Sequence, residues 1–187
     1  VATTAAGTQY GVAKNATVVP VRLLNCAGSG QVTGVVAAMD WILSPANPNP
    51  KTQAVLNMSI GGNKSVAVND AVERLVNAGI TVVVAAGNEN SDACIKSPAS
   101  APNAITVGAT TWADVKASYS NFGACVDINA PGSSITGGWI YSNSSTRTIN
   151  GTSMASPHVA GAAAVYRGLY PTATVAQVTA ALVGTAT

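Results

Sequence analysis

Hydrophobic and polar positions along the chain recur with two different periods. Short apolar runs that are rich in β-branched residues and bounded by glycine, proline or asparagine are typical of buried strands. Apolar residues spaced three and four apart are typical of helices that face a core. The predicted strands are residues 16–24, 54–60, 80–86, 104–107 and 126–130. The predicted helices are residues 32–43, 66–77, 152 to about 170 and 174–183; residues 45–50 are predicted as a loop, and residues 1–11 have no clear period.

The order of these elements predicts an α/β fold. A succession of strand, helix, strand, helix and strand favours a parallel sheet that is covered by helices. Residues 80–86 form an almost unbroken apolar run, which is typical of a strand covered on both faces. Ligands of such sheets bind beyond the carboxyl ends of the strands, and Gly28, Gly61 and Gly87 follow predicted strands there. We therefore expect the functional site at that edge of the sheet.

Composition narrows the class of protein. The chain has 187 residues, which suits one domain with a sizeable core. Only 9% of the residues are charged, and small residues supply much of the 48% that are hydrophobic, so the composition indicates a tightly packed fold. A net charge of +2 is too small to indicate nucleic-acid binding. No apolar run approaches the roughly 20 residues that a membrane helix needs, so we expect neither a nucleic acid nor a membrane as partner.

The segment Gly151–Gly161 carries the strongest chemical signal in the chain. It reads Gly-Thr-Ser-Met-Ala-Ser-Pro-His-Val-Ala-Gly, with Ser153 among small residues at the start of a predicted buried helix. A helix N-terminus has unpaired N–H groups and the positive end of the helix dipole, which can stabilise an oxyanion formed by attack at that serine. Gly-Thr-Ser alone is an ordinary helix start, because serine and threonine are favoured caps. The eleven residues together are more specific.

Gly151–Gly161 resembles the nucleophile segment of subtilisin-like serine proteases. Other segments, along nearly the whole chain, resemble the proteinase K branch of this family, close to aqualysin-type bacterial enzymes. The resemblance implies a secreted serine endopeptidase with a three-layer, parallel-sheet subtilisin-like fold, acting on protein and peptide substrates through an Asp-His-Ser triad. It implies Ser153 as the nucleophile and Asn88, after the strand 80–86, as an oxyanion donor with the Ser153 N–H. Taken alone, Asn88 fits equally an asparagine that ends a strand in a turn.

The general base of such a triad is not apparent in these residues. His158, the one histidine of the sequence, follows Ser153 by five residues on the same predicted helix and so points about 140° away from it. We expect a packed, hydrogen-bonded His158 without a catalytic role. Residues 10–13, Tyr-Gly-Val-Ala, resemble a segment that follows the family's histidine motif. The resemblance therefore implies a single partial peptidase catalytic domain over residues 1–187, incomplete at both ends. A second chain is one possible source of the missing aspartate and histidine segments.

Three glycine-containing segments resemble the family's substrate-binding segments. Edge strands of these proteases pair with the substrate backbone, and glycine permits a close approach. Small, uncharged walls would favour a large apolar or aromatic side chain before the cleaved bond, with broad tolerance of other residues. Each glycine taken alone fits an ordinary turn. The expected substrate-binding residues are Gly28, Ser29, Gly30, Ser59, Ile60, Gly61, Ala85, Ala86 and Gly87.

Two stabilising features follow from the resemblance only. The proteinase K branch has a calcium site made of two backbone carbonyls and one aspartate, and Pro102, Ala104 and Asp127 match those positions. Cys94 and Cys125 match a disulfide of aqualysin-like enzymes, with three buried thiols as the alternative, and Cys26 matches a cysteine whose family partner lies upstream.

Two other functions stay open. A sedolisin-like acid protease would use serine with glutamate and aspartate; Asn88 argues against it because sedolisins place an aspartate there, and the adjacent Glu89 is poorly placed as a base. A catalytically dead fragment that binds peptides is the alternative from another class. With its single histidine, the chain alone is expected to be inactive.

Overall fold

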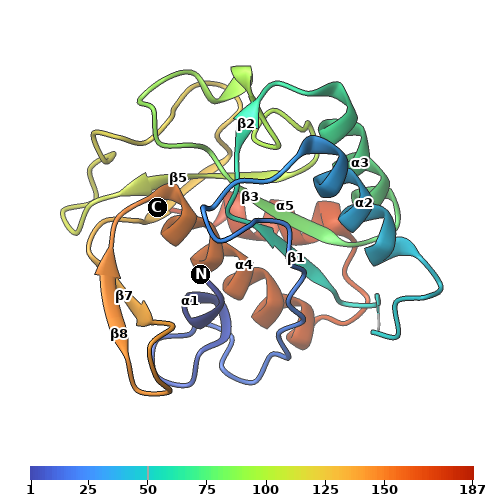
Figure 1. Ribbon diagram of the computed structural model, residues 1–187, viewed down its shortest axis with the longest axis horizontal. Helices are drawn as coiled ribbons and strands as arrows, with labels where there is room; N and C mark the ends of the chain where they lie inside the picture. The colour runs from blue at the N-terminus through green and yellow to red at the C-terminus, as the bar shows by residue number, and fades with distance from the viewer. Residues whose placement is uncertain (50) are drawn as a thin grey trace.

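A parallel sheet forms the centre of the computed structural model, which describes residues 1–49 and 51–187 (Figure 1). Its four strands lie in the order β1-β3-β5-β6, and all neighbouring strands are parallel. The strands are β1 (Val55–Met58), β3 (Thr81–Ala85), β5 (Ile105–Thr110) and β6 (Ile128–Pro131). Two antiparallel pairs lie outside this sheet: β2 (Gly62–Asn63) with β4 (Lys96–Ser97), and β7 (Ile135–Gly138) with β8 (Thr146–Ile149).

Helices cover both faces of the central sheet. They are α1 (Ala2–Ala6), α2 (Val32–Leu43), α3 (Val66–Asn77), α4 (Thr152–Leu169) and α5 (Val175–Gly184), with a short 3-10 helix η1 (Ala93–Ile95). Val82 and Val84 of β3 pack in one core cluster with residues of α2 and α3, whereas Val83 packs in a second cluster with residues of α4. Because alternate residues of one strand enter different cores, the predicted three-layer α/β arrangement is confirmed. None of the described helices is both long and apolar enough to cross a membrane.

The bounds of α3 follow directly from its sequence. Ser65 caps the helix by accepting the Val68 N–H at 3.4 Å, and Gly79, with φ +86°, lies just beyond its end. Its buried residues, Val68, Ala71, Val72 and Leu75, recur at intervals of three and four and so form one face. The prediction for residues 66–77 is therefore confirmed.

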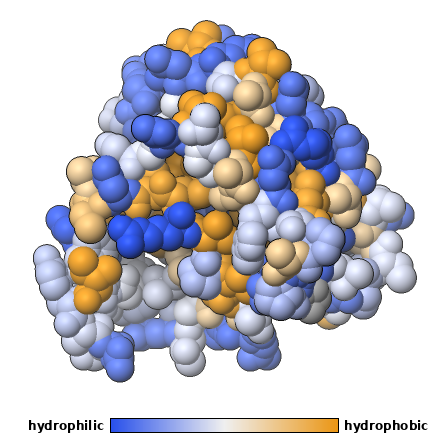
Figure 2. All heavy atoms as spheres, turned by 45° about the vertical axis from the view of Figure 1, so that its right-hand side comes forward, coloured by the Kyte–Doolittle hydropathy of each residue, from blue (hydrophilic) through white to orange (hydrophobic). Residues whose placement is uncertain are grey.

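The predicted strand at residues 16–24 is wrong. This segment has no secondary structure, and Val18 and Val19 are 50% and 43% exposed. A groove of about 1230 Å³ lies between it and β1, which pairs only with β3 within the described part of the chain. β-branched residues favour an extended backbone, but a strand also needs a hydrogen-bonded neighbour. On the side of the molecule shown in Figure 2, exposed apolar residues (orange) lie between polar ones (blue).

The remaining predictions differ mainly at the element ends. Strands predicted at 54–60, 80–86, 104–107 and 126–130 correspond to β1, β3, β5 and β6, and the helices at 32–43, 152–170 and 174–183 correspond to α2, α4 and α5. The loop 45–50 is confirmed over 45–49, and Pro50 lies outside the described residues. The pattern did not predict α1, η1, β2, β4 or the β7–β8 hairpin.

Candidate active site

Ser153 lies at the start of α4, the helix that contacts all four strands of the central sheet. Its side chain is half-buried, and Oγ donates to the Ser59 carbonyl at 3.2 Å. Ser59 follows β1, and its own Oγ donates to the Ser153 carbonyl at 3.0 Å. Asn57 holds the same region, because its Nδ2 donates to Ser59 Oγ at 2.9 Å and its Oδ1 accepts from Ser156 Oγ at 2.7 Å. The serine hydroxyl is thus fixed at the carboxyl end of β1.

The turn before α4 depends on glycine. Gly151 has φ +150°, a conformation that residues with side chains rarely adopt. Its N–H donates to the Gly132 carbonyl at 2.9 Å and to the Tyr119 hydroxyl at 3.2 Å. Asn150 Oδ1 accepts the Ser134 N–H at 2.6 Å. Contacts from Tyr119 and from the segment after β6 therefore set the direction in which the first turn of α4 begins.

Asn88 reaches the same helix start from the end of β3. Its Oδ1 accepts from the Thr152 N–H at 2.8 Å and from Thr152 Oγ1 at 2.9 Å, while the Gly87 N–H donates to that Oγ1 at 3.2 Å. Because two donors hold the carboxamide oxygen, the Nδ2 group is the part of Asn88 left to donate elsewhere. The predicted nucleophile and the predicted oxyanion donor are therefore brought together through Thr152.

His158 is held by backbone groups. Its Nδ1 lies 2.9 Å from the Met154 carbonyl, one turn earlier in α4. Burial lowers the pKa of His158, whereas hydrogen bonds with the backbone of Met154 and Pro131 act in the opposite direction. This environment matches the expected packed, hydrogen-bonded histidine. Within residues 1–49 and 51–187, no other histidine is present to take the Ser153 proton.

The predicted substrate segments lie in different environments. Residues 28–31 are exposed. The first of them lie in a turn in which Asn25 Oδ1 accepts the N–H groups of Ala27 and Ser29. Ile60 is half-buried and Gly61 is exposed. The side chains of Ala85 and Ala86 are buried, so the surface there is formed by Gly87 and the loop that follows it.

Asp127 lies beside the start of β5. Its Oδ2 accepts the Thr106 N–H at 2.7 Å, and its own N–H donates to the Thr106 carbonyl at 3.0 Å. Partial burial of the carboxyl raises its pKa, and the Thr106 N–H opposes that shift. No cluster of three or more His, Cys, Asp or Glu side chains occurs in the described residues. A cation at Asp127 would therefore need backbone carbonyls, such as those of Pro102 and Ala104, which immediately precede β5.

Comparison with known proteins decides the family. The chain matches the Subtilase family along its whole length, residues 1–187. It belongs to the subtilase family. The "Extracellular serine proteinase" of Thermus sp. is 56% identical over 187 residues, which make up 100% of this chain and 45% of that protein. The "Cuticle-degrading serine protease" of Arthrobotrys oligospora is 55% identical over 163 residues, 87% of this chain and 39% of that protein. This subtilase chain thus spans less than half the length of either relative.

A solved structure supports the same family at the level of the fold. The crystal structure of "a cold adapted subtilisin-like serine proteinase" has a TM-score of 0.88 and 46% sequence identity to this subtilase. The match covers 94% of this chain and 62% of that chain. The expected subtilisin-like fold is therefore confirmed.

The subtilase chain contains the expected disulfide. Cys94 and Cys125 are bonded, with their Cα atoms 5.3 Å apart, and Cys26 is an exposed free cysteine. The bridge joins η1 to the segment before β6. Backbone bonds run alongside it, from the Ala93 N–H to the Phe122 carbonyl at 2.8 Å and from the Phe122 N–H to the Ser91 carbonyl at 3.0 Å.

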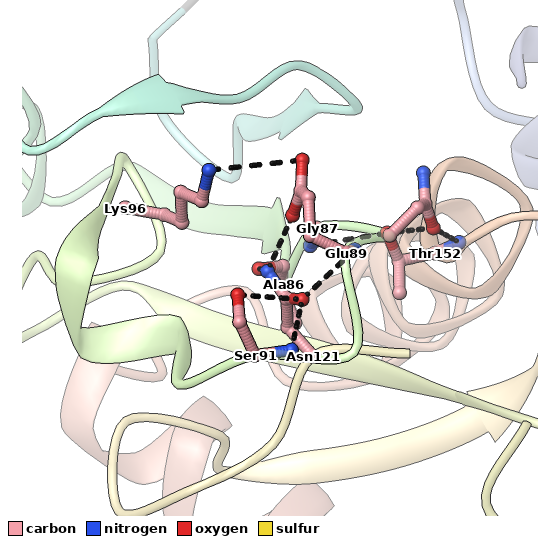
Figure 3. A network of polar contacts seen from close by, with 8 residues as sticks. Ala86, Gly87, Glu89, Ser91, Lys96, Asn121 and Thr152 are labelled. Carbon is pink, nitrogen blue, oxygen red and sulfur yellow. Dashed lines mark hydrogen bonds and ion pairs between the residues drawn. The ribbon is translucent and has the colours of Figure 1, made fainter. Parts of the chain in front are cut away.

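Sequence reasoning missed two residues at this subtilase site. The sequence indicates Thr152 only as a favoured helix cap, whereas in the structure it joins Asn88 to α4. Asn121, 1% exposed, lies inside the loop that carries Asn88 and contacts both ends of it (Figure 3). Thr152 lies in the segment Gly151–Gly161, but that pattern does not predict its hydrogen bonds with Asn88, and Asn121 belongs to no such pattern. These contacts join parts of the chain that are far apart in sequence.

Proposed function

We propose that this chain supplies the nucleophile and the oxyanion donors of a serine endopeptidase. The observation that carries the proposal is the link from Asn88 through Thr152 to Ser153 at the start of α4. In peptide hydrolysis, Ser153 Oγ would lose its proton to a general base and attack the scissile carbonyl carbon. The C–N bond would then break, the amine would leave with that proton, and water would hydrolyse the acyl-enzyme to the acid and free Ser153. Asn88 Nδ2 and the Ser153 N–H would stabilise the negative oxygen of the tetrahedral intermediate.

The proton of Ser153 needs a general base to accept it during the reaction. Its present acceptor, the Ser59 carbonyl, is not a base that can carry a proton through the reaction. His158 is held by the Met154 carbonyl on the same helix. We therefore propose that a histidine and an aspartate come from polypeptide outside these 187 residues and that the chain alone is inactive.

The groove beside β1 suits this additional polypeptide. It is lined by apolar residues of segment 12–23, β1, α2 and α4, among them Val21, Leu56 and Ala160. The backbone of β1 is unpaired on the groove side within the described residues, so an extended segment could add to the sheet there. Ser59 lines the groove and bonds to Ser153, so catalytic groups carried past the carboxyl end of β1 by such a segment would lie close to the nucleophile.

Substrates of the completed enzyme are proposed to be proteins and peptides with a large apolar or aromatic residue before the cleaved bond. Residues 28–31 and 59–61 are at least partly accessible and would pair with the substrate backbone. We propose secretion because the Thermus relative is named as extracellular and this chain contains a disulfide.

Calcium is proposed as a structural cofactor at Asp127. The donor types suit calcium, because one Asp127 carboxylate oxygen accepts the Thr106 N–H while Asp127 remains exposed to solvent. The carbonyls of Pro102 and Ala104 would complete the protein ligands. Carboxylate and carbonyl oxygens are the ligands that calcium prefers. The ion would neutralise the charge that partial burial of the Asp127 carboxyl disfavours.

The test is hydrolysis of a chromogenic peptide with an aromatic residue before the scissile bond. The chain is measured alone and after refolding with the parts of the Thermus relative that lie outside the matched region. We expect turnover only in the mixture, with its loss in Ser153→Ala and its retention in His158→Gln. Turnover that survives Ser153→Ala would refute the nucleophile assignment.

A second candidate function is peptide binding without catalysis, which the single histidine favours. Peptide binding by both wild type and Ser153→Ala, with no turnover in any mixture, would support it over the endopeptidase. A turnover maximum at acid pH that depends on Glu89 would instead support the sedolisin-like alternative.

A further inference from the structure

Asn121 fills the inside of the loop that follows β3. Its Nδ2 donates to the Ala86 carbonyl at 2.9 Å and to Glu89 Oε2 at 2.8 Å. Its Oδ1 accepts from the N–H groups of Glu89 and Ser91, both at 3.0 Å, and from Ser91 Oγ at 3.3 Å. Figure 3 shows these contacts converging on one carboxamide, with Gly87 and Thr152 on the neighbouring side.

The backbone of the same residue binds the loop as well. The Asn121 N–H donates to the Gly87 carbonyl at 3.0 Å, so residues on both sides of Asn88 are attached to Asn121. A Cβ atom at Gly87 would lie 2.2 Å from Asn121 Nδ2, which means that the loop closes tightly around the carboxamide. Because Asn121 is 1% exposed, water cannot replace these bonds without a rearrangement of the loop.

Asn88 is consequently held from two directions. Thr152 fixes its carboxamide oxygen, and Asn121 fixes the backbone of the residues before and after it. We propose that Asn121 is a positioning residue that sets the direction of Asn88 Nδ2 toward the oxyanion. The inference rests on the proposed function, because it concerns the donor in that reaction. Asn121 acts through Asn88 and is not itself proposed to touch substrate.

The polarity of Asn121 provides a specific test. Asn121→Asp keeps the shape and the three accepted bonds but directs an oxygen at two acceptors, the Ala86 carbonyl and Glu89 Oε2. Repulsion should move the loop and misdirect Asn88. Protonation of the introduced carboxyl restores one donor, so the misdirection of Asn88 should diminish as the pH falls. In Glu89→Gln/Asn121→Asp, the introduced glutamine amide can donate to the introduced carboxylate and restore one contact with reversed polarity.

The experiment measures kcat and KM in the refolded mixture described under Proposed function, with the melting temperature of each variant. We expect Asn121→Asp to lower kcat roughly 10- to 100-fold, less than or comparable to the roughly 10²–10³-fold loss for removal of an oxyanion donor, with little change in KM. The ratio of variant to wild-type kcat should rise on acidification, and the double variant should recover part of the loss relative to the Glu89→Gln control. Asn69→Asp is the matched control, since Asn69 lies in α3 and its side chain makes hydrogen bonds with the side chains of Ser97 and Ser100.

The outcomes separate the two proposals. Absence of Ser153-dependent turnover in the wild-type mixture would overturn the proposed function and this inference with it. Wild-type turnover that Asn121→Asp leaves unchanged would overturn this inference alone. A kcat loss that is equal at every pH, is shared by Asn69→Asp and is not recovered in the double variant would reveal general destabilisation and would also overturn it.

Discussion

Removal of the Cys94–Cys125 disulfide should destabilise the protein substantially. The bridge closes a loop with a sequence separation of 31, for which chain entropy predicts a stabilisation of about 3.7 kcal/mol at 25 °C. The backbone bonds beside the bridge remain when it is removed, so the native loop should keep its shape. The loss should therefore arise mainly from the greater freedom of the unfolded chain.

The assay is urea denaturation of wild type and of Cys94→Ala/Cys125→Ala, monitored by circular dichroism. We expect the free energy of unfolding to fall by about 3–4 kcal/mol and the melting temperature to fall by roughly 7–15 °C for a chain of this size. Cys26→Ala, at an exposed and unbridged cysteine, is the control and should change stability by less than about 0.5 kcal/mol. A loss below about 1 kcal/mol in the double variant would refute the loop-closure argument.

Three further predictions concern α4 and the proposed metal site. Gly161→Ala should destabilise the protein by about 1–3 kcal/mol in urea titrations, because the added Cβ would lie 2.7 Å from Val12 Cβ. At Gly168, in the same helix, an added Cβ meets open space, so Gly168→Ala should stabilise the protein by about 0.4–1 kcal/mol. Equal effects of the two substitutions would contradict the close contact at Gly161. Burial lowers the pKa of His158, so the contribution of this residue to the free energy of unfolding should be full above its unfolded pKa of 6.5 and be lost as pH falls below that value. His158→Gln should therefore weaken the fall in melting temperature at low pH. Chelation should lower the melting temperature of wild type but not of Asp127→Asn, and equal shifts in both would remove the site. Without metal, the raised pKa of Asp127 means that the contribution of this carboxyl to stability falls as pH rises above its unfolded pKa of 3.8, so Asp127→Asn should then be at least as stable as wild type at neutral pH.

Periodicity predicted the elements that are stabilised locally or are buried on both faces. α3 has a serine cap, one apolar face and a glycine beyond its end, so residues 66–77 could be assigned without reference to other elements. β3 could be assigned because all five of its residues are buried and apolar or β-branched. The disulfide and the family could be anticipated because the relevant residues stand in a motif or at a matching spacing.

Segments that have no paired neighbour, or that have no strong apolar period, were predicted wrongly or missed. Residues 16–24 have the composition of a strand but no paired neighbour among the residues that the structure describes. The β7–β8 hairpin is rich in glycine, serine and threonine, and helix α1 is only five residues long, so neither has a strong apolar period. Asn121 was missed for a related reason, because its role arises from contacts with residues 30 to 35 positions away.

The exposed segment at residues 16–24 has a consequence for the lifetime of an active enzyme. Proteases bind peptides in extended form, and this segment is already without secondary structure and exposes Val18 and Val19. Under the proposed function, a chain whose groove is still empty would therefore be a substrate for a completed enzyme molecule, and polypeptide that fills the groove would protect it. Self-digestion should begin there, and the rate at which this segment is cut would report how completely the groove is filled.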